Sequence, residues 1–250
     1  YNVGIGHFAI AGLTSGTNNV AVGTQALYVN TTGSSNVAMG RDALTANTTG
    51  GDNVAVGYAS LGVNTTGASN TALGAYALDA NTTAGNNTAV GAGSVGSNTT
   101  GAGNTGIGRV ALTTNTTGND NVALGYRALN LSTTASNNTA IGKDALYANT
   151  TGHSNVAVGA LALDANTTGE ENTAVGKNAL GANTTASYNT SMGSSSMLVN
   201  TTGANNVALG VNALKSNTTA SNNTGIGFNA LVANTTGRDN TALGFSAGAT

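Results

Sequence analysis

Three side chains of this sequence could take part in acid–base chemistry. Glu170 and Glu171 are adjacent carboxylates, and His153 lies one sequence repeat, seventeen residues, before Glu170. Paired carboxylates, or a carboxylate beside an imidazole, are groups that transfer protons in enzymes. Neighbouring residues of a turn usually diverge into solvent, however, and no other acidic residue lies seventeen residues from either glutamate. We therefore predict a His153–Glu170 surface pair rather than a catalytic site.

The sequence offers no other assembly of catalytic or metal-binding residues. Cysteine is absent, and the only other histidine is His7. No Ser-His-Asp arrangement and no metal-ligand spacing can be assembled. Calcium-binding solenoid repeats need an aspartate in every turn, whereas aspartate is sporadic here. We predict that the protein is not an enzyme and that it binds no metal or cofactor.

A recurring Asn-Thr-Thr triplet points to a different chemistry, because it matches the acceptor pattern for N-linked glycans. If a strand continues through the triplet, its first and third residues point outward together, so each repeat would display one acceptor. O-linked sugar on threonine and a purely structural role at turns are the alternatives. The candidate glycosylation sites are Asn30, Asn47, Asn64, Asn81, Asn98, Asn115, Asn149, Asn166, Asn183, Asn200, Asn217 and Asn234.

A seventeen-residue repeat, which runs from Tyr1 to Thr250 without insertion or deletion, must position all these residues. Its consensus is Asn-Thr-Thr-Gly-x-x-Asn-(Val/Thr)-Ala-(aliphatic)-Gly-x-x-Ala-Leu-x-(small), and we number positions from its first Asn. A fixed short period with fixed turn residues predicts identical stacked coils, one repeat per coil, in an all-β parallel solenoid. We expect residues 1–250 to form one continuous array, cut from a longer one.

Alternation with period two predicts two short strands in each coil. Positions eight and ten, such as Val37 and Met39, are expected to face inward, and the small residue at nine outward. Leu at position fifteen, such as Leu44, would face inward from the second strand. Gly or Ala at four and Gly at eleven mark two corners, which favours a two-sided roll. Small residues at nine and fourteen, such as Ala38 and Ala43, would leave smooth outer faces.

Charge and composition agree with this register and exclude several functions. All nine acidic and seven basic residues lie at positions five, six, twelve, thirteen or sixteen. The net charge of -2 predicts no attraction to nucleic acid or to an anionic membrane. No run of eighteen apolar residues is present, so we expect no transmembrane helix. Proline is absent as well, which suits a ladder in which nearly every amide donates.

Position seven is asparagine in every repeat, and we predict a structural role for it. Side-chain amides stacked at a coil corner can form a hydrogen-bonded ladder along the axis, as they do in cross-β stacks. The members of this expected ladder are Asn2, Asn19, Asn36, Asn53, Asn70, Asn87, Asn104, Asn121, Asn138, Asn155, Asn172, Asn189, Asn206, Asn223 and Asn240.

Position twelve carries several aromatic and cationic residues in successive repeats. Arg109, Tyr126 and Lys143 follow one another there, as do Phe228 and Phe245. Stacked rings and cation–π pairs stabilise a surface without any ligand. We therefore predict surface stabilisation at these sites, with local receptor contacts as the alternative.

The phrases Asn-Val-Ala-Val-Gly (53–57), Asn-Thr-Ala-Val-Gly (87–91) and Asn-Val-Ala-Leu-Gly (121–125) resemble the head repeats of trimeric autotransporter adhesins. Related phrases occur in some phage tail fibres. The resemblance extends over the whole chain and implies a left-handed parallel β-roll, often trimeric, displayed outside a cell and used for attachment. Those heads repeat at about fourteen residues. The Asn-Thr-Thr-Gly arm is the additional part here.

Together these observations predict a structural segment of an extracellular fibre or cell-surface adhesin, acting in attachment or as a rigid spacer. We expect self-association into a trimer or fibre, an unknown surface receptor, covalent glycans on the Asn-Thr-Thr arm, and no membrane contact by this segment. The alternative is an ice-binding solenoid with outward threonine rows. Tyr28, Asp79 and Lys215 at position sixteen would share that face and break its flatness.

Overall fold

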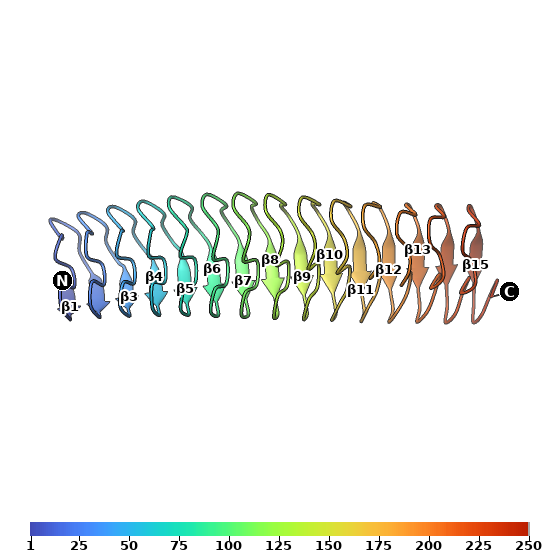
Figure 1. Cartoon of the computed structure of the whole chain (residues 1–250), viewed down its shortest axis with the longest axis horizontal. Coiled ribbons are helices and arrows are strands. Elements are labelled where there is room, and N and C mark those ends of the chain that lie inside the picture. The colour runs from blue at the N-terminus through green and yellow to red at the C-terminus, as the bar shows by residue number, and fades with distance from the viewer. Residues whose placement is uncertain (250) are drawn as a thin grey trace. The chain divides into compact units, whose positions relative to one another are not determined.

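The protein is an all-β parallel solenoid with one short strand in each repeat, as a computed structural model of residues 1–249 shows (Figure 1). These residues contain fifteen strands and no helix, so the predicted fold class is confirmed. The chain comprises two compact units, Tyr1–Ala123 and Leu124–Thr250. The strands are β1 (Asn2–Ile5), β2 (Asn19–Val22), β3 (Val37–Met39), β4 (Val54–Val56), β5 (Thr71–Leu73), β6 (Thr88–Val90), β7 (Thr105–Ile107), β8 (Val122–Leu124), β9 (Thr139–Ile141), β10 (Val156–Val158), β11 (Thr173–Val175), β12 (Thr190–Met192), β13 (Val207–Leu209), β14 (Thr224–Ile226) and β15 (Thr241–Leu243).

Strands within each unit pair in parallel and in sequence order. In the first unit Val37 of β3 lies opposite Val54 of β4. In the second unit Thr173 of β11 lies opposite Thr190 of β12. Every residue therefore faces its equivalent in the next repeat, which places each repeat position in a column along the unit.

The two faces of the strand are the reverse of what the sequence pattern predicts. Ala38 at position nine is fully buried, whereas Val37 is half-buried and Met39 is 44% exposed. The interior is too narrow for a larger group at position nine: a Cβ on Gly106 would lie 2.5 Å from the Cγ2 of Val95. The small residue therefore points inward, and the larger side chains at positions eight and ten point outward.

The second strand expected in each coil does not form. Residues 41–46, at positions twelve to seventeen, are turns. Asp42 and Leu44 have φ of 60° and 51°, and such alternating left-handed residues cannot belong to an extended strand. Coil-to-coil hydrogen bonding nevertheless continues through the turns, since Leu44 N donates to Ser60 O at 3.1 Å. Sequence alternation alone does not reveal leucines with positive φ.

The core is built from positions nine, fourteen and fifteen. Leu78 at position fifteen is fully buried, as predicted, but Ala77 at position fourteen is also fully buried rather than outward. One coil shows how these positions face each other. Ser191 at position nine and Ser196 at position fourteen are both buried, and their hydroxyl oxygens lie 2.6 Å apart. In this coil two small residues therefore meet across the core, and Met197 takes the place of the leucine.

Glycine at position eleven is required by both backbone conformation and space. Gly57 has φ of 135°, outside the left-handed helical region that asparagine or leucine adopts elsewhere in the repeat. A Cβ on Gly57 would also lie 2.6 Å from the carbonyl carbon of Gly74 in the next coil. These two constraints explain why the position is glycine in every repeat.

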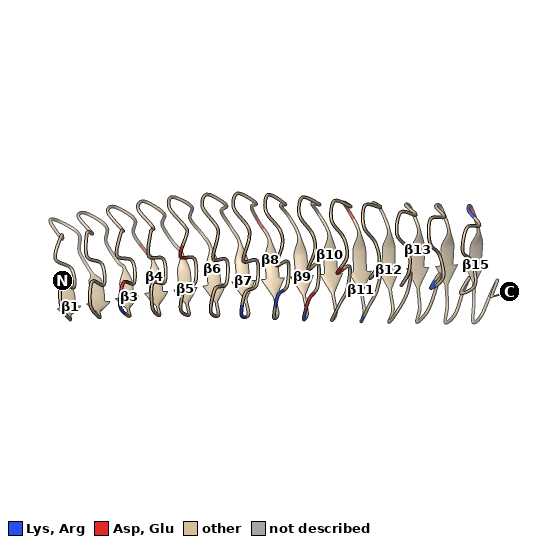
Figure 2. Ribbon diagram, in the orientation of Figure 1, with Lys and Arg blue, Asp and Glu red and all other residues tan. Residues whose placement is uncertain are grey.

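Charged residues lie in the turns between the strands (Figure 2). Most of them are exposed, as Arg41 is, with 62% of its side chain accessible. Several others, such as Asp79 and Asp164, are half-buried, and Asp144 is only 4% exposed. The strand faces themselves carry no charge, because positions eight to ten hold none in any repeat.

Candidate functional site

The asparagines at position seven are stacked inside the solenoid. Every one from Asn19 to Asn223 is fully buried. Asn36 shows the pattern: its Nδ2 donates to Asn19 Oδ1 at 3.2 Å and to Gly50 O at 2.9 Å. Its Oδ1 accepts from the backbone N and the Nδ2 of Asn53, at 3.0 and 3.1 Å. The amide thus uses both donors and both acceptor sites, which no other side chain of this size can do.

The asparagines of the Asn-Thr-Thr triplet form a second buried stack. The expectation that their side chains point outward is wrong, whereas glycan attachment to them stays a prediction. Asn47 is fully buried, and its Nδ2, the atom that would carry a glycan, donates to Asn30 Oδ1 and to Gly50 O, both at 2.9 Å. Among the twelve candidate acceptors, only Asn234 is not fully buried. The triplet does not continue the strand, so period-two parity does not apply to it.

Both stacks meet at the carbonyl of position four. Gly50 O accepts one amide from Asn36 of the preceding coil and one from Asn47 of its own coil. A Cβ on Gly50 would lie 2.4 Å from the next coil's Gly67 O, so coils approach closely here. This arrangement ties the Asn-Thr-Thr arm to the strand at one buried point per coil.

Position one of the first repeat of the second unit is Ser132 instead of asparagine. In the second unit Asn149 Nδ2 donates to Gly152 O at 2.8 Å, whereas the next member, Asn166, donates to both Gly169 O and Asn149 Oδ1. In the first unit Asn115 Oδ1 is buried and has no hydrogen-bond partner among the described residues. Such an unsatisfied buried acceptor costs about 1–3 kcal/mol.

The two threonines of the triplet have different environments. Thr48 at position two is half-buried, and its hydroxyl donates to Thr65 O at 3.1 Å. Thr49 and Thr66 at position three are exposed. The outward rows expected at positions one and three are therefore reduced to one row of hydroxyls, at position three.

The candidate acid–base residues form the predicted surface pair. His153 Nε2 lies 2.9 Å from Glu170 Oε2, with side chains 46% and 41% exposed. Glu171 has φ of 53°, and its backbone N donates to His153 O. The geometry brings together one histidine and one carboxylate at an open turn, without an enclosed site around them.

A first cluster of aromatic and charged residues lies on the turns of the first unit. Arg41 Nη2 donates to the Tyr58 hydroxyl at 2.7 Å, and its guanidinium lies 4.5 Å from the Tyr58 ring centroid. Tyr58 meets Tyr76 edge to face at 5.1 Å. A hydrogen bond with Tyr58 is the main reason that the pKa of Tyr76 is raised. Arg41 and Tyr58 both occupy position twelve, whereas Tyr76 occupies position thirteen, so the cluster extends beyond the column in which the sequence predicts stacking.

A second cluster lies on the turns of the second unit. Arg127 Nε donates to Asp144 Oδ1 at 2.7 Å, and its guanidinium lies 4.7 Å from the Tyr147 ring centroid. The predicted stack of Phe228 on Phe245 is confirmed, with centroids 5.3 Å apart and planes at 12°. Arg127 at position thirteen thus makes a cation–π contact that the pattern at position twelve did not predict. The stacking of Arg109, Tyr126 and Lys143 stays a prediction.

The hollows of the described surface are shallow. One, with a volume of about 330 Å³, is lined by Thr219, Ser221, Asn222, Thr236 and Arg238. Within residues 1–249 no group of three or more His, Asp or Glu side chains could hold a metal ion. No helix long and apolar enough to span a bilayer occurs in that range either. The features that recur along each unit are instead the buried amide stacks and the exposed columns.

No family model, no curated protein and no solved structure matches this chain.

Proposed function

We propose that this chain is a structural segment of an extracellular fibre or surface adhesin, acting as a rigid spacer or attachment surface. The observation that supports this role is the double amide stack, in which Asn36 and Asn47 each bond to equivalents in both neighbouring coils. Tilting one coil against the next would break buried hydrogen bonds that water cannot replace. The repeat therefore favours stiffness along the unit.

The proposed attachment role belongs to the variable turns. Positions twelve and thirteen carry side chains such as Arg41, Tyr58 and Tyr76, which differ from coil to coil while the core stays constant. Exposed aromatic and arginine side chains are common in recognition surfaces. The cell-surface location is supported by the resemblance of the repeated phrases to adhesin heads. The proposal assigns no catalysis to this chain.

Glycans, in this proposal, would be carried by threonine rather than asparagine. Thr49 and Thr66 present exposed hydroxyls, whereas Asn47 and Asn64 are fully buried. Mass spectrometry of native peptides spanning residues 47–66 distinguishes sugar attached to asparagine from sugar attached to threonine. Hexose mass on asparagine would contradict the proposal, and hexose mass on threonine would support a sugar-coated fibre.

Labelling of intact cells tests the proposed location. Lys143 is well exposed, with 66% of its side chain accessible, so a membrane-impermeant amine reagent should modify it on intact cells as fully as in a lysate. Lys177 and Lys215 provide two further sites in the same unit. Labelling only after lysis would contradict an extracellular role.

A further inference from the structure

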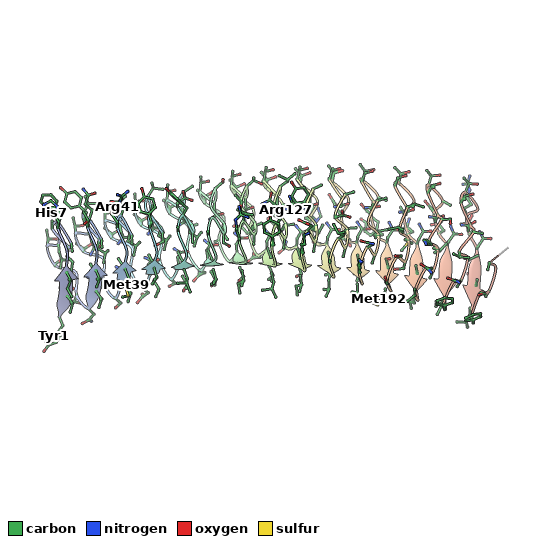
Figure 3. All side chains as sticks on the ribbon, turned by 60° about the horizontal axis from the view of Figure 1, so that its bottom comes forward. Tyr1, His7, Met39, Arg41, Arg127 and Met192 are labelled. Atoms are coloured by element: carbon green, nitrogen blue, oxygen red, sulfur yellow. The ribbon has the colours of Figure 1, made fainter. Side chains whose placement is uncertain are left out.

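The outer face of the sheet is uncharged in each unit, and its column at position ten is apolar throughout. Position eight holds Val or Thr, position ten holds an aliphatic residue or Met, and no repeat has a charge at either position. Several of these side chains are well exposed: Val54 is 37%, Leu73 47% and Met192 41% accessible. Met39 and Met192 project from the strands in Figure 3. A face of this kind is an association surface in most proteins.

We propose that this face pairs with the same face of a second copy, as two sheets packed against each other in a dry interface. The inference rests on the proposed fibre role and names its partner. Both partners carry columns of similar, uncharged side chains, which repeat every coil at about 4.8 Å. Matched periods allow the side chains of one sheet to fill the gaps of the other, as in steric zippers.

The size of the face is sufficient for a stable dimer. A three-residue strand is about 10 Å long, so seven coils give a footprint of roughly 340 Å². The first unit contains β1–β7 and the second β9–β15. If each unit pairs with its own equivalent in the second copy, the two separate faces of a chain cover about 700 Å² in all, near the roughly 800 Å² per partner that stable complexes bury.

Geometry limits this association to two chains. Each coil has one strand and therefore one such face, so pairing uses the face completely and closes the assembly. Two parallel chains related by a two-fold axis along the solenoid bring column eight of one copy against column ten of the other. Small Val or Thr side chains then face larger aliphatic ones, which packs better than large against large. Antiparallel chains would instead set each column against itself.

Charge substitution on the face tests the pairing. The face variant carries Val56→Lys, Leu73→Glu and Val90→Lys, with alternating signs so that neighbouring coils do not repel. The matched control carries Thr66→Lys, Thr83→Glu and Thr100→Lys at the exposed position three. We expect the unmodified chain and the control to sediment as dimers, and the face variant to be a folded monomer with a Kd at least 100-fold higher.

Three results of sedimentation would overturn the pairing. These are an unmodified chain that stays monomeric at about 100 μM, a trimer, and a control that dissociates as readily as the face variant. Circular dichroism of both variants excludes unfolding as the cause. If the chain is monomeric but is labelled on intact cells, the pairing is wrong and the extracellular fibre role is still supported. If the chain is dimeric but is labelled only after lysis, the extracellular role is wrong and the pairing is still supported.

Cross-linking tests the parallel arrangement. In the variant Thr71→Cys/Leu73→Cys, parallel chains place each new thiol opposite the other thiol of the same coil in the partner. A short bismaleimide should then give covalent dimers, and Thr66→Cys should not. An intact dimer in which Thr71→Cys/Leu73→Cys fails to cross-link would overturn the parallel arrangement.

Discussion

Asparagine at position seven is specified by the number of hydrogen bonds that it makes. Asn53 Nδ2 donates to Asn36 Oδ1 and Gly67 O, and its Oδ1 accepts from Asn70 N and Nδ2. Aspartate has nearly the same shape but no donor, and its charge would be buried beside two oxygen acceptors. The sequence indicated this stack through invariance at position seven, but not that position one forms another. The second stack was not predicted, because the Asn-Thr-Thr triplet that forms it also matches the acceptor pattern for N-linked glycans.

We expect Asn53→Asp to lower the free energy of unfolding by about 3–5 kcal/mol at pH 7, the usual cost of an unpaired buried charge. Urea unfolding followed by circular dichroism measures the change. The control is Asn86→Asp at the exposed position six, where aspartate already occurs as Asp52 and Asp120. Equal effects of the two substitutions would show that the buried stack does not stabilise the fold.

Two aspartates at position sixteen give the protein a pH dependence of known sign. Burial is the main reason that the pKa values of Asp79 and Asp164 are raised above the ordinary 3.8. A raised folded-state pKa means that these groups stabilise the fold when protonated, and that this stabilisation is lost as pH rises above the ordinary aspartate range. At neutral pH both charges are therefore unfavourable to folding.

The double variant Asp79→Asn/Asp164→Asn should accordingly have a higher urea midpoint than the unmodified chain at pH 7. The difference should shrink toward zero near pH 3.5, because both aspartates are then protonated. Asp52→Asn, at an exposed turn position, is the control and should change the midpoint little at either pH. A gain that persisted unchanged at pH 3.5 would contradict burial of charge as the cause.

Each coil combines one strand with a run of turns, and this division limited what the sequence could predict. The strand itself was predictable from the β-branched residue at position eight and the glycine at position eleven. Which side of the strand faces the core was not predictable, because alternation with a period of two looks the same whichever side is buried. The choice depends on volume: Ala72 and Leu78 fill the coil interior, and position nine holds only Ala, Gly or Ser in every repeat. Positive φ at Leu78, which removes the second strand, has no signal in residue type.

Adding volume at position nine tests this inverted packing. Ala72 is fully buried, so Ala72→Val would force two extra methyl groups into the core and cost about 1–3 kcal/mol in the free energy of unfolding. Thr71→Val, one residue earlier on the outer face, should be nearly neutral, since valine occupies position eight in other repeats. If Thr71→Val lowered the free energy of unfolding in urea more than Ala72→Val did, the orientation predicted from the sequence alone would be supported instead.

The period of seventeen is the property of the whole chain that the sequence expresses most directly. It predicted parallel coils in register, and Val54 does face Thr71 and Val37 in its unit. Both amide stacks, the glycine column and the outer apolar face depend on that register, because each joins a residue to its equivalent seventeen positions away. The stability of a solenoid is approximately a sum over its coils and the contacts between neighbouring coils. Loss of a whole coil therefore removes one term of the sum, whereas a deletion that is not a multiple of seventeen residues misaligns the equivalent positions of neighbouring coils.

Deletion of residues 54–70 removes one whole repeat and joins Asn53 to Thr71, so position eight still follows position seven. We expect this variant to fold, with β-sheet circular dichroism per residue unchanged and only a small fall in the urea midpoint. Deletion of residues 54–67 removes fourteen residues and joins Asn53 to Ala68 at position five. That change leaves Val37 and Thr71 twenty residues apart, three more than one period, so the coils on either side are out of phase and the midpoint should fall well below that of the longer deletion. If the fourteen-residue deletion were the more stable, the seventeen-residue register would not be what holds the coils together.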